Sequence, residues 1–158
     1  MNNIQPPRTL RGGFLFLGIQ KSNMQYWLIK SDPDTYPWEQ MVEEKETFWN
    51  GIRNYAARNF MREMKKGDRC LFYHSVKDPA VVGIVEVTKE AYPDHTAKEG
   101  DWSMVDVKVV KALPRIVSLK EIKAAGALKD MELLRVTRLS VSPVRELEYK
   151  HILHMGGL

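Results

Sequence analysis

The sequence predicts a single α+β domain built on a curled or barrel-like sheet of about five to six strands, with short helices flanking it. A length of 158 residues is typical of one domain. Several β-rich runs occur along the chain, but they do not alternate regularly with helices as the strands of a parallel βαβ sheet would. The predicted helices are short and fall between these runs, and no internal repeat divides the chain.

The first half of the chain predicts one strand and two helices. Residues 25–31 are rich in Tyr, Trp, Leu and Ile and end at Asp32-Pro33, where a strand ladder cannot continue. A short helix is predicted over 37–44, because Pro37 suits the first turn of a helix. A longer helix is predicted over 55–65 and ends before Gly67, a residue type that commonly stops helices.

The second half predicts a hairpin, a long strand and two helices. Residues 69–75 and 81–88 are β-rich and flank Lys77-Asp78-Pro79, so they predict an antiparallel hairpin. A third long strand is expected over 104–113, and a short helix over 119–125. The remaining elements are a broken extended segment over 133–141 and a last helix, introduced by Ser142-Pro143, that runs to about residue 153.

Composition restricts the possible classes of function. Lys and Arg exceed Asp and Glu by 24 to 20, and the basic residues gather between Lys45 and Lys77. This region is expected to attract an anion, although a solvated helix face is the alternative. The single cysteine, Cys70, excludes a disulfide framework and a multi-cysteine zinc site, which fits a reducing, cytoplasmic setting. No apolar run is long enough to cross a membrane, and residues 1–23 are expected to form a tail outside the fold.

The segment Trp49–Phe60 contains a turn, two guanidiniums, three carboxamides and large aromatic rings just ahead of a helix. Asn50-Gly51 can adopt a positive φ at low cost, so the chain can reverse after Trp49 and present Arg53, Asn54 and Tyr55. This mixture favours recognition of a flat, polar and anionic ligand. A tryptophan in the core followed by an ordinary turn and a basic helix is the alternative interpretation.

Six motifs, in order, resemble those of the EVE domain family: Trp27–Pro33, Trp49–Phe60, Phe72–Ser75, Tyr92–Asp94, Trp102–Val107 and Arg138–Val144. The resemblance runs from about Met24 to Leu153 and places the domain at 24–158. It implies a PUA-like fold, a small β-barrel with flanking helices related to YTH, ASCH and SRA-type readers. It also implies a pocket for a modified nucleobase of DNA or RNA in a binding module that is not an enzyme. Two departures are Asp32, where Glu is common, and a short segment between His95 and Trp102, which is expected to open the rim of the pocket.

The residues offer what the reading of a base needs, which is a flat apolar wall, hydrogen-bonding groups for the base edge and cations for the phosphates. Trp49 and Tyr73 are predicted to stack on the base. The other predicted ligand-binding residues are Lys30, Ser31, Arg53, Asn54 and Ser75, and the predicted phosphate-binding residues are Arg58, Arg62, Lys65 and Lys66. Tyr73 and Ser75 lie two apart and share one face of their strand, which leaves His74 on the other face as a core or supporting residue.

The predicted function is non-catalytic recognition of a modified base, such as a cytosine or adenine derivative, by a monomer that needs no cofactor or metal. Two alternatives stay open: a nucleic-acid-processing enzyme that uses His74 or His95 with a carboxylate, and a pocket for a free nucleotide or small anion. Trp102 is either a third wall of an aromatic cage or a plug beneath the barrel, and the plug is favoured.

Other catalytic and metal-binding arrangements fit the sequence less well. Cys70 and His74 lie about 13 Å apart on a strand, too far for a nucleophile–base pair, so Cys70 is interpreted as a core residue. His151 and His154 share a helix face without a third ligand. Asp94-His95 and Asp32-Pro33-Asp34 have the composition of turns.

Overall fold

The computed structural model describes residues 23–158. The predicted tail, 1–23, therefore lies outside the described residues except for Asn23, and it stays a prediction. Within the described range, no helix is long and apolar enough to cross a membrane.

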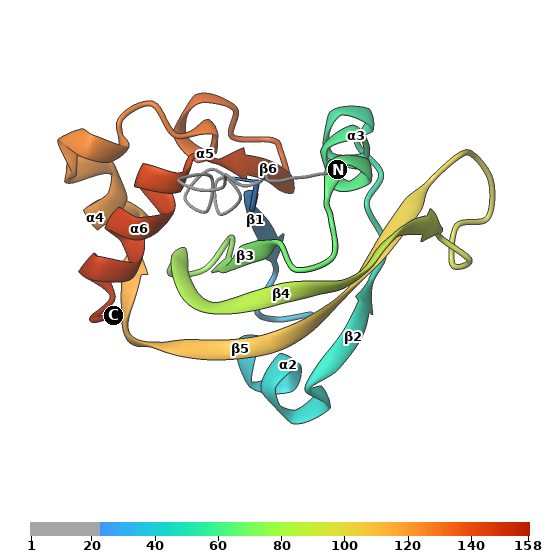
Figure 1. Ribbon diagram of the computed structural model, residues 1–158, viewed down its shortest axis with the longest axis horizontal. Helices are drawn as coiled ribbons and strands as arrows, with labels where there is room; N and C mark the ends of the chain where they lie inside the picture. The colour runs from blue at the N-terminus through green and yellow to red at the C-terminus, as the bar shows by residue number, and fades with distance from the viewer. Residues whose placement is uncertain (1–22) are drawn as a thin grey trace, which may run out of the picture.

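A six-stranded mixed sheet forms the centre of the domain (Figure 1). Its order is β2-β5-β4-β3-β1-β6, with β1 parallel to β3 and every other pair antiparallel. The strands are β1 (Tyr26–Ser31), β2 (Glu46–Trp49), β3 (Arg69–His74), β4 (Ala80–Pro93), β5 (Ser103–Ser118) and β6 (Val141–Val144). The sheet is barrel-like but not closed, because β2 and β6 are its edges. The predicted α+β fold class is confirmed.

The curl of the sheet originates in the long pair β4 and β5. Their pairing register shifts at four places between Val81 and Tyr92, and such bulges bend a strand and increase its twist. Gly83 lies in this bent region. A Cβ atom there would be 2.4 Å from the ring of Trp38, so only glycine allows that indole to pack against the sheet.

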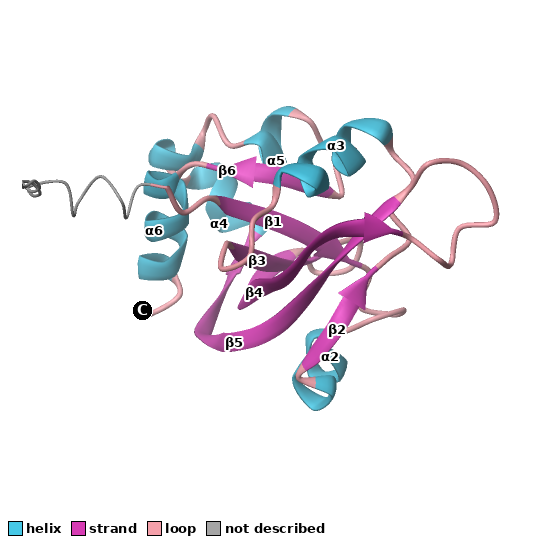
Figure 2. Ribbon diagram, turned by 45° about the vertical axis from the view of Figure 1, so that its right-hand side comes forward, coloured by secondary structure: helices cyan, strands magenta, loops and turns pink. Residues whose placement is uncertain are grey.

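The helices cover the two sides of the sheet separately. Figure 2 shows α4 and α6 together at one end and α5 beside β6, while α3 and α2 lie at the top and bottom of the view and both pack on the same core. The helices are α2 (Trp38–Glu44), α3 (Tyr55–Glu63), α4 (Leu119–Ala124), the 3-10 helix η2 (Gly126–Leu128), α5 (Glu132–Arg135) and α6 (Glu146–Met155).

The sheet is buried on both faces, and each face has its own core. Alternation along β1 and β3 sends neighbouring side chains to opposite faces. The first core contains Trp27, Ile29, Trp49, Cys70 and Phe72 with side chains of α2 and α3. The second core contains Leu28, Leu71 and Tyr73 with side chains of α4, α5 and α6. The interpretation of Cys70 as a core residue is confirmed, and burial raises the pKa of its thiol.

Two expectations about the elements are wrong, and one strand was not predicted. Residues 133–141 do not form an extended segment: their first part belongs to α5, which buries Leu133. Ser142-Pro143 does not introduce the last helix but lies in β6, an edge strand, where a proline without an N–H is tolerated. Strand β2 was not expected, because four residues directly after a helix are too few for an alternating pattern.

Candidate functional site

A cavity of about 510 Å³ opens where β1 ends beside β2 and the turn that follows it. This volume lies within the range of about 300–1,000 Å³ common for small-molecule sites. We call it the Trp49 cavity, and it is lined by Lys30, Ser31, Asp32, Thr35, Tyr36, Glu44, Thr47, Phe48, Trp49, Asn50, Gly51, Ile52 and Ser140.

The indole of Trp49 is a fixed wall of this cavity. Only 8% of Trp49 is exposed, and its ring meets Tyr36 and Phe72 edge-on, with centroid distances of 5.6 and 5.5 Å. The hydroxyl of Tyr36 donates a hydrogen bond to Glu44 (2.7 Å). Burial and this carboxylate together raise the pKa of Tyr36, so its ring stays neutral beside the indole.

Two consecutive residues at the end of β1 line this cavity, and their side chains point to opposite faces of the sheet. The hydroxyl of Ser31 donates to the carbonyl oxygen of Tyr36. The ammonium of Lys30 donates to the carbonyl oxygen of Thr137 (2.9 Å), and burial lowers its pKa. Because Lys30 is paired with Tyr73 and alternates with Ser31, its ammonium lies on the Tyr73 face of the sheet, opposite Trp49.

Asp94 holds the turn at the rim of the cavity. Its buried carboxylate accepts hydrogen bonds from the backbone N–H of Gly51 (2.9 Å), from Arg53 (3.0 Å), and from the backbone and hydroxyl of Thr96. Burial alone would raise the pKa of Asp94, but these hydrogen bonds outweigh it and hold the pKa well below its usual range. Gly51 has a φ of +82°, which only glycine adopts easily. The interpretation of Asp94 as a turn residue is confirmed through Thr96, whereas its bonds to Gly51 and Arg53 were not anticipated.

The structure brings some of the predicted ligand-binding residues together. Lys30, Ser31 and Trp49 all line the Trp49 cavity. Arg53 lies just beyond the rim, where its guanidinium is paired with Asp94. Asn54 caps the N-terminus of α3, since its side-chain oxygen accepts from the backbone N–H of Ala57 (2.9 Å).

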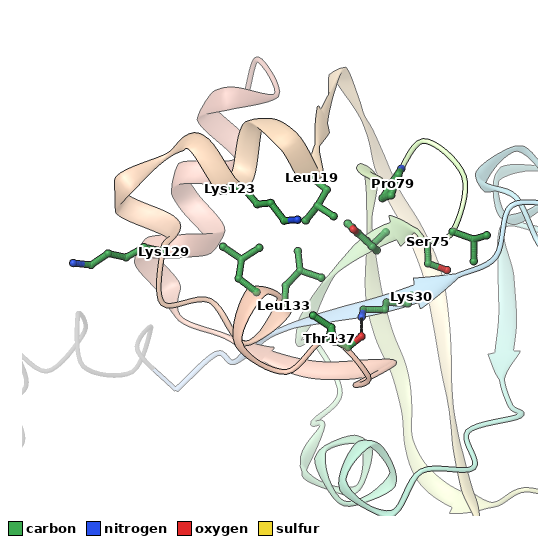
Figure 3. A pocket seen from close by; sticks show the side chains of 11 residues that line it. Lys30, Ser75, Pro79, Leu119, Lys123, Lys129, Leu133 and Thr137 are labelled. Atoms are coloured by element: carbon green, nitrogen blue, oxygen red, sulfur yellow. Dashed lines mark hydrogen bonds between the residues drawn. The ribbon is translucent and has the colours of Figure 1, made fainter.

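Tyr73 and Ser75 line a different cavity, of about 470 Å³, beside α4 and α5 (Figure 3). Figure 3 shows Lys30 bonded to Thr137 at its edge, so Lys30 borders both cavities. Tyr73 belongs to the second core and Trp49 to the first. The two rings therefore lie on opposite faces of the sheet and do not enclose one ligand.

The four predicted phosphate-binding residues fall into two pairs. Arg58 donates to the carbonyl oxygen of Asp101 (3.0 Å), and Arg62 pairs with the Asp101 carboxylate (2.8 Å) and donates to Ser103 (2.9 Å). These bonds tie α3 to the end of the β4–β5 hairpin. Lys65 and Lys66 are exposed, and neither takes part in an ion pair among residues 23–158.

Trp102 and the candidate histidines have other surroundings. The favoured interpretation of Trp102 as a plug is wrong, because the half-buried indole stacks on the exposed ring of Tyr55. His74 accepts the backbone N–H of Trp38 at Nε2 (3.0 Å), and burial lowers its pKa. His95 is exposed and packs edge-on against Phe48. In the described part of the chain, no group of three or more His, Cys, Asp or Glu side chains is placed to hold a metal ion.

The chain is similar to several known proteins. Thymocyte nuclear protein 1 of the chicken is 39% identical over 175 residues, covering 87% of this chain and 72% of the relative, and the human protein is 36% identical over 169 residues, covering 85% and 75%. A crystal structure of an Agrobacterium tumefaciens protein superposes with a TM-score of 0.82 at 47% identity, covering 85% of this chain and 94% of that one.

Two further structures extend the comparison. Human THYN1 was solved in complex with DNA containing 5-methylcytosine, and it matches with a TM-score of 0.79 at 34% identity, covering 85% of this chain and 98% of that one. A YTH domain of Zygosaccharomyces rouxii, at 15% identity and a TM-score of 0.54, shares the fold. The PUA-like fold implied by the resemblance is therefore confirmed. The EVE domain model matches residues 25–155, and the chain belongs to the EVE domain family.

Proposed function

We propose that this chain is a non-catalytic nucleic-acid-binding domain that holds a modified nucleobase of DNA or RNA in the Trp49 cavity. The observation that carries the proposal is the Trp49 indole fixed in the wall of a cavity of about 510 Å³, in a chain similar to a human protein solved with 5-methylcytosine DNA. A modified cytosine is therefore the first ligand to test.

The energetics require both stacking and polar contacts. A base stacked on an aromatic side chain gains about 1–3 kcal/mol, and removing a base from a duplex costs a few kcal/mol. Stacking on Trp49 alone would only balance that cost. Polar groups at the cavity, such as Ser31 and Asp32, supply the remaining affinity and discriminate among bases.

Three potential catalytic groups already have structural roles, which supports a binding function. The Nε2 lone pair of His74 accepts a backbone N–H, the Asp94 carboxylate accepts several hydrogen bonds, and the Cys70 thiol is fully buried. Recovery of a modified oligonucleotide unchanged after incubation, measured by mass spectrometry, tests this part of the proposal. A cleaved or demodified product would favour the enzyme alternative.

Binding measurements on two variants test the cavity. Trp49→Leu should weaken binding to a 5-methylcytosine oligonucleotide by at least about 1 kcal/mol, or fivefold, because a stacking surface is lost. Ser31→Ala should instead reduce the preference for the modified base. Fluorescence anisotropy with modified and unmodified oligonucleotides measures both effects.

Tyr73→Phe is the matched control, because Tyr73 is a buried aromatic residue on the opposite face of the sheet. It should leave affinity and preference unchanged. Thermal unfolding must accompany these measurements, since truncating a buried tryptophan commonly costs about 3–5 kcal/mol of stability. A folded Trp49→Leu protein that binds as tightly as wild type would show that Trp49 is a core residue and does not contact the ligand. The monomeric state and cytoplasmic location stay predictions.

A further inference from the structure

A pair of stacked aromatic rings lies outside the Trp49 cavity. Tyr55, the first residue of α3, stacks on Trp102 with a centroid distance of 5.0 Å and an interplanar angle of 17°. Tyr55 is nevertheless 67% exposed, so most of its surface remains in contact with water. Folding gains little from an aromatic side chain that stays this exposed, and the described contacts of Tyr55 do not account for so large a ring at this position.

Two fixed guanidiniums accompany these rings. Arg58 lies 5.0 Å from the ring centre of Tyr55 and 5.7 Å from that of Trp102, and Arg53 lies 5.7 Å from that of Trp102. Arg53 is held by Asp94 and by its bond to the carbonyl oxygen of Ile52 (2.9 Å). Arg58 is held by Asp101 and Asn59. The positive charges therefore have defined positions beside the rings before any ligand arrives.

The loop ahead of Trp102 is also shaped around the indole. A Cβ atom on Gly100 would lie 2.6 Å from Nε1 of Trp102, and Gly100 has a φ of +90°. Glycine at this position allows the loop to pass directly over the edge of the ring. The hairpin thus fixes the orientation of Trp102, and the stacking contact with Trp102 orients Tyr55.

The stacked pair stands next to the rim of the cavity. Tyr55 follows Gly51 by four residues, so their Cα atoms are at most about 14 Å apart. Asp94 bonds both to Gly51 at the rim and to Arg53 beside Trp102. Successive nucleotides of one stacked strand rise about 3.4 Å each, so a nucleotide near the one in the cavity can reach the rings.

We propose that Tyr55 and Trp102 form a second stacking site, which takes an unpaired nucleotide adjacent to the one in the Trp49 cavity. The base stacks on the exposed face of Tyr55, and its phosphate meets Arg53 and Arg58, which is the combination that single-stranded nucleic acids require. This inference rests on the proposed nucleic-acid binding. It differs from the base recognition in the cavity because stacking is indifferent to the modification.

The test uses an octamer of unmodified deoxyuridine, whose bases carry no 5-methyl group, and measures its affinity for the full chain by fluorescence anisotropy at low salt. Tyr55→Leu should weaken binding by about 5- to 150-fold, the range expected for the loss of one stacked base. Tyr55→Phe should bind nearly as tightly as wild type, since it keeps the ring.

Tyr26→Leu is the matched control, because Tyr26 also stacks on a second ring, that of Tyr149, at 4.2 Å and 27°. It should leave the affinity unchanged. The inference is overturned if the wild-type chain does not bind the octamer, if Tyr55→Leu binds it as tightly as wild type, or if Tyr26→Leu weakens binding to the same extent. The preference for a methylated over an unmethylated oligonucleotide tests the function of the cavity separately, and Tyr55→Leu should leave that ratio unchanged.

Discussion

Asp94 connects the β4–β5 hairpin to the rim of the Trp49 cavity through a single buried carboxylate. Asp94→Asn preserves the shape of the side chain but removes the negative charge that accepts hydrogen bonds from Gly51, Arg53 and Thr96. We expect the free energy of unfolding at neutral pH to fall by about 1–3 kcal/mol, the usual cost of disrupting buried hydrogen bonds to a charged group. Chemical denaturation measures this loss.

The same substitution makes a prediction about pH. The pKa of Asp94 is depressed in the folded chain, so the folded state favours the ionised carboxylate. Its contribution is complete above the unfolded pKa of about 3.9 and is lost as pH falls below it towards the folded value. The stability difference between wild type and Asp94→Asn should therefore shrink on acidification below about pH 4. A constant difference down to pH 2 would show that the charge of Asp94 does not stabilise the fold.

Asn54 was predicted to contact the ligand, and its position as the N-cap of α3 leads to a different expectation. Asn54→Ala removes the acceptor for Ala57 and should cost about 1 kcal/mol of stability. Asn54→Ser and Asn54→Asp should retain most of it, because both residues are good N-caps. Thermal unfolding compares the three variants. Equal losses in all three would point to a role for the carboxamide beyond capping.

At the scale of residues, three of the predicted ligand-binding residues line one cavity, but the sequence did not predict how the set divides between the two cavities. Lys30, Ser31 and Trp49 were predicted together, and they meet because β1 and β2 both end at the cavity. Tyr73 was expected to join them, but alternation along a strand determines only which residues share a face, not which face meets which core. The bond from Asp94 to Gly51 joins residues 43 positions apart, and no local pattern reports such a contact.

Helix α3 presents two kinds of cation. Arg58 and Arg62 direct their donors to Asp101 and Ser103, whereas Lys65 and Lys66 are exposed and lie just after the helix ends at Glu63. Lys65→Ala combined with Lys66→Ala should weaken binding of all oligonucleotides alike and lower the salt dependence by nearly one unit for each lost phosphate contact.

Lys123→Ala on α4 is the control for this prediction, because Lys123 is an exposed lysine beside the second cavity. It should leave the salt slope unchanged. If the double variant keeps both its affinity and its salt slope, the end of α3 is only a solvated face.

At the scale of elements, long patterns were predicted well and short ones poorly. The expected strands over 25–31 and 69–75 and the helix over 55–65 agree with β1, β3 and α3 to within one or two residues. Strand β2, α5 and β6 contain four residues each, too few for a period of 2 or 3.6 to be distinguished. Their conformations depend on the neighbours they meet in the folded chain.

For the molecule as a whole, the two-faced sheet has a functional consequence. Because each face is buried against its own helices, the Trp49 cavity lies where the sheet ends, at the edge formed by β1, β2 and the segment before β6. The wall of that cavity, Trp49, is almost completely buried. A base that is still paired in a duplex cannot bring its face against this indole, so the proposed function requires the base to leave the stack.

This requirement gives a prediction that uses only the oligonucleotide. Pairing and stacking oppose extrusion by a few kcal/mol, so a 5-methylcytosine opposite an abasic site should bind at least about tenfold more tightly than one opposite guanine, a difference of about 1.4 kcal/mol. The control duplex carries the abasic site opposite a neighbouring base, which weakens the duplex but leaves the modified base paired. Competition anisotropy compares the three duplexes. Equal affinity for all of them would mean that the modification is read in the groove, without entry into the Trp49 cavity.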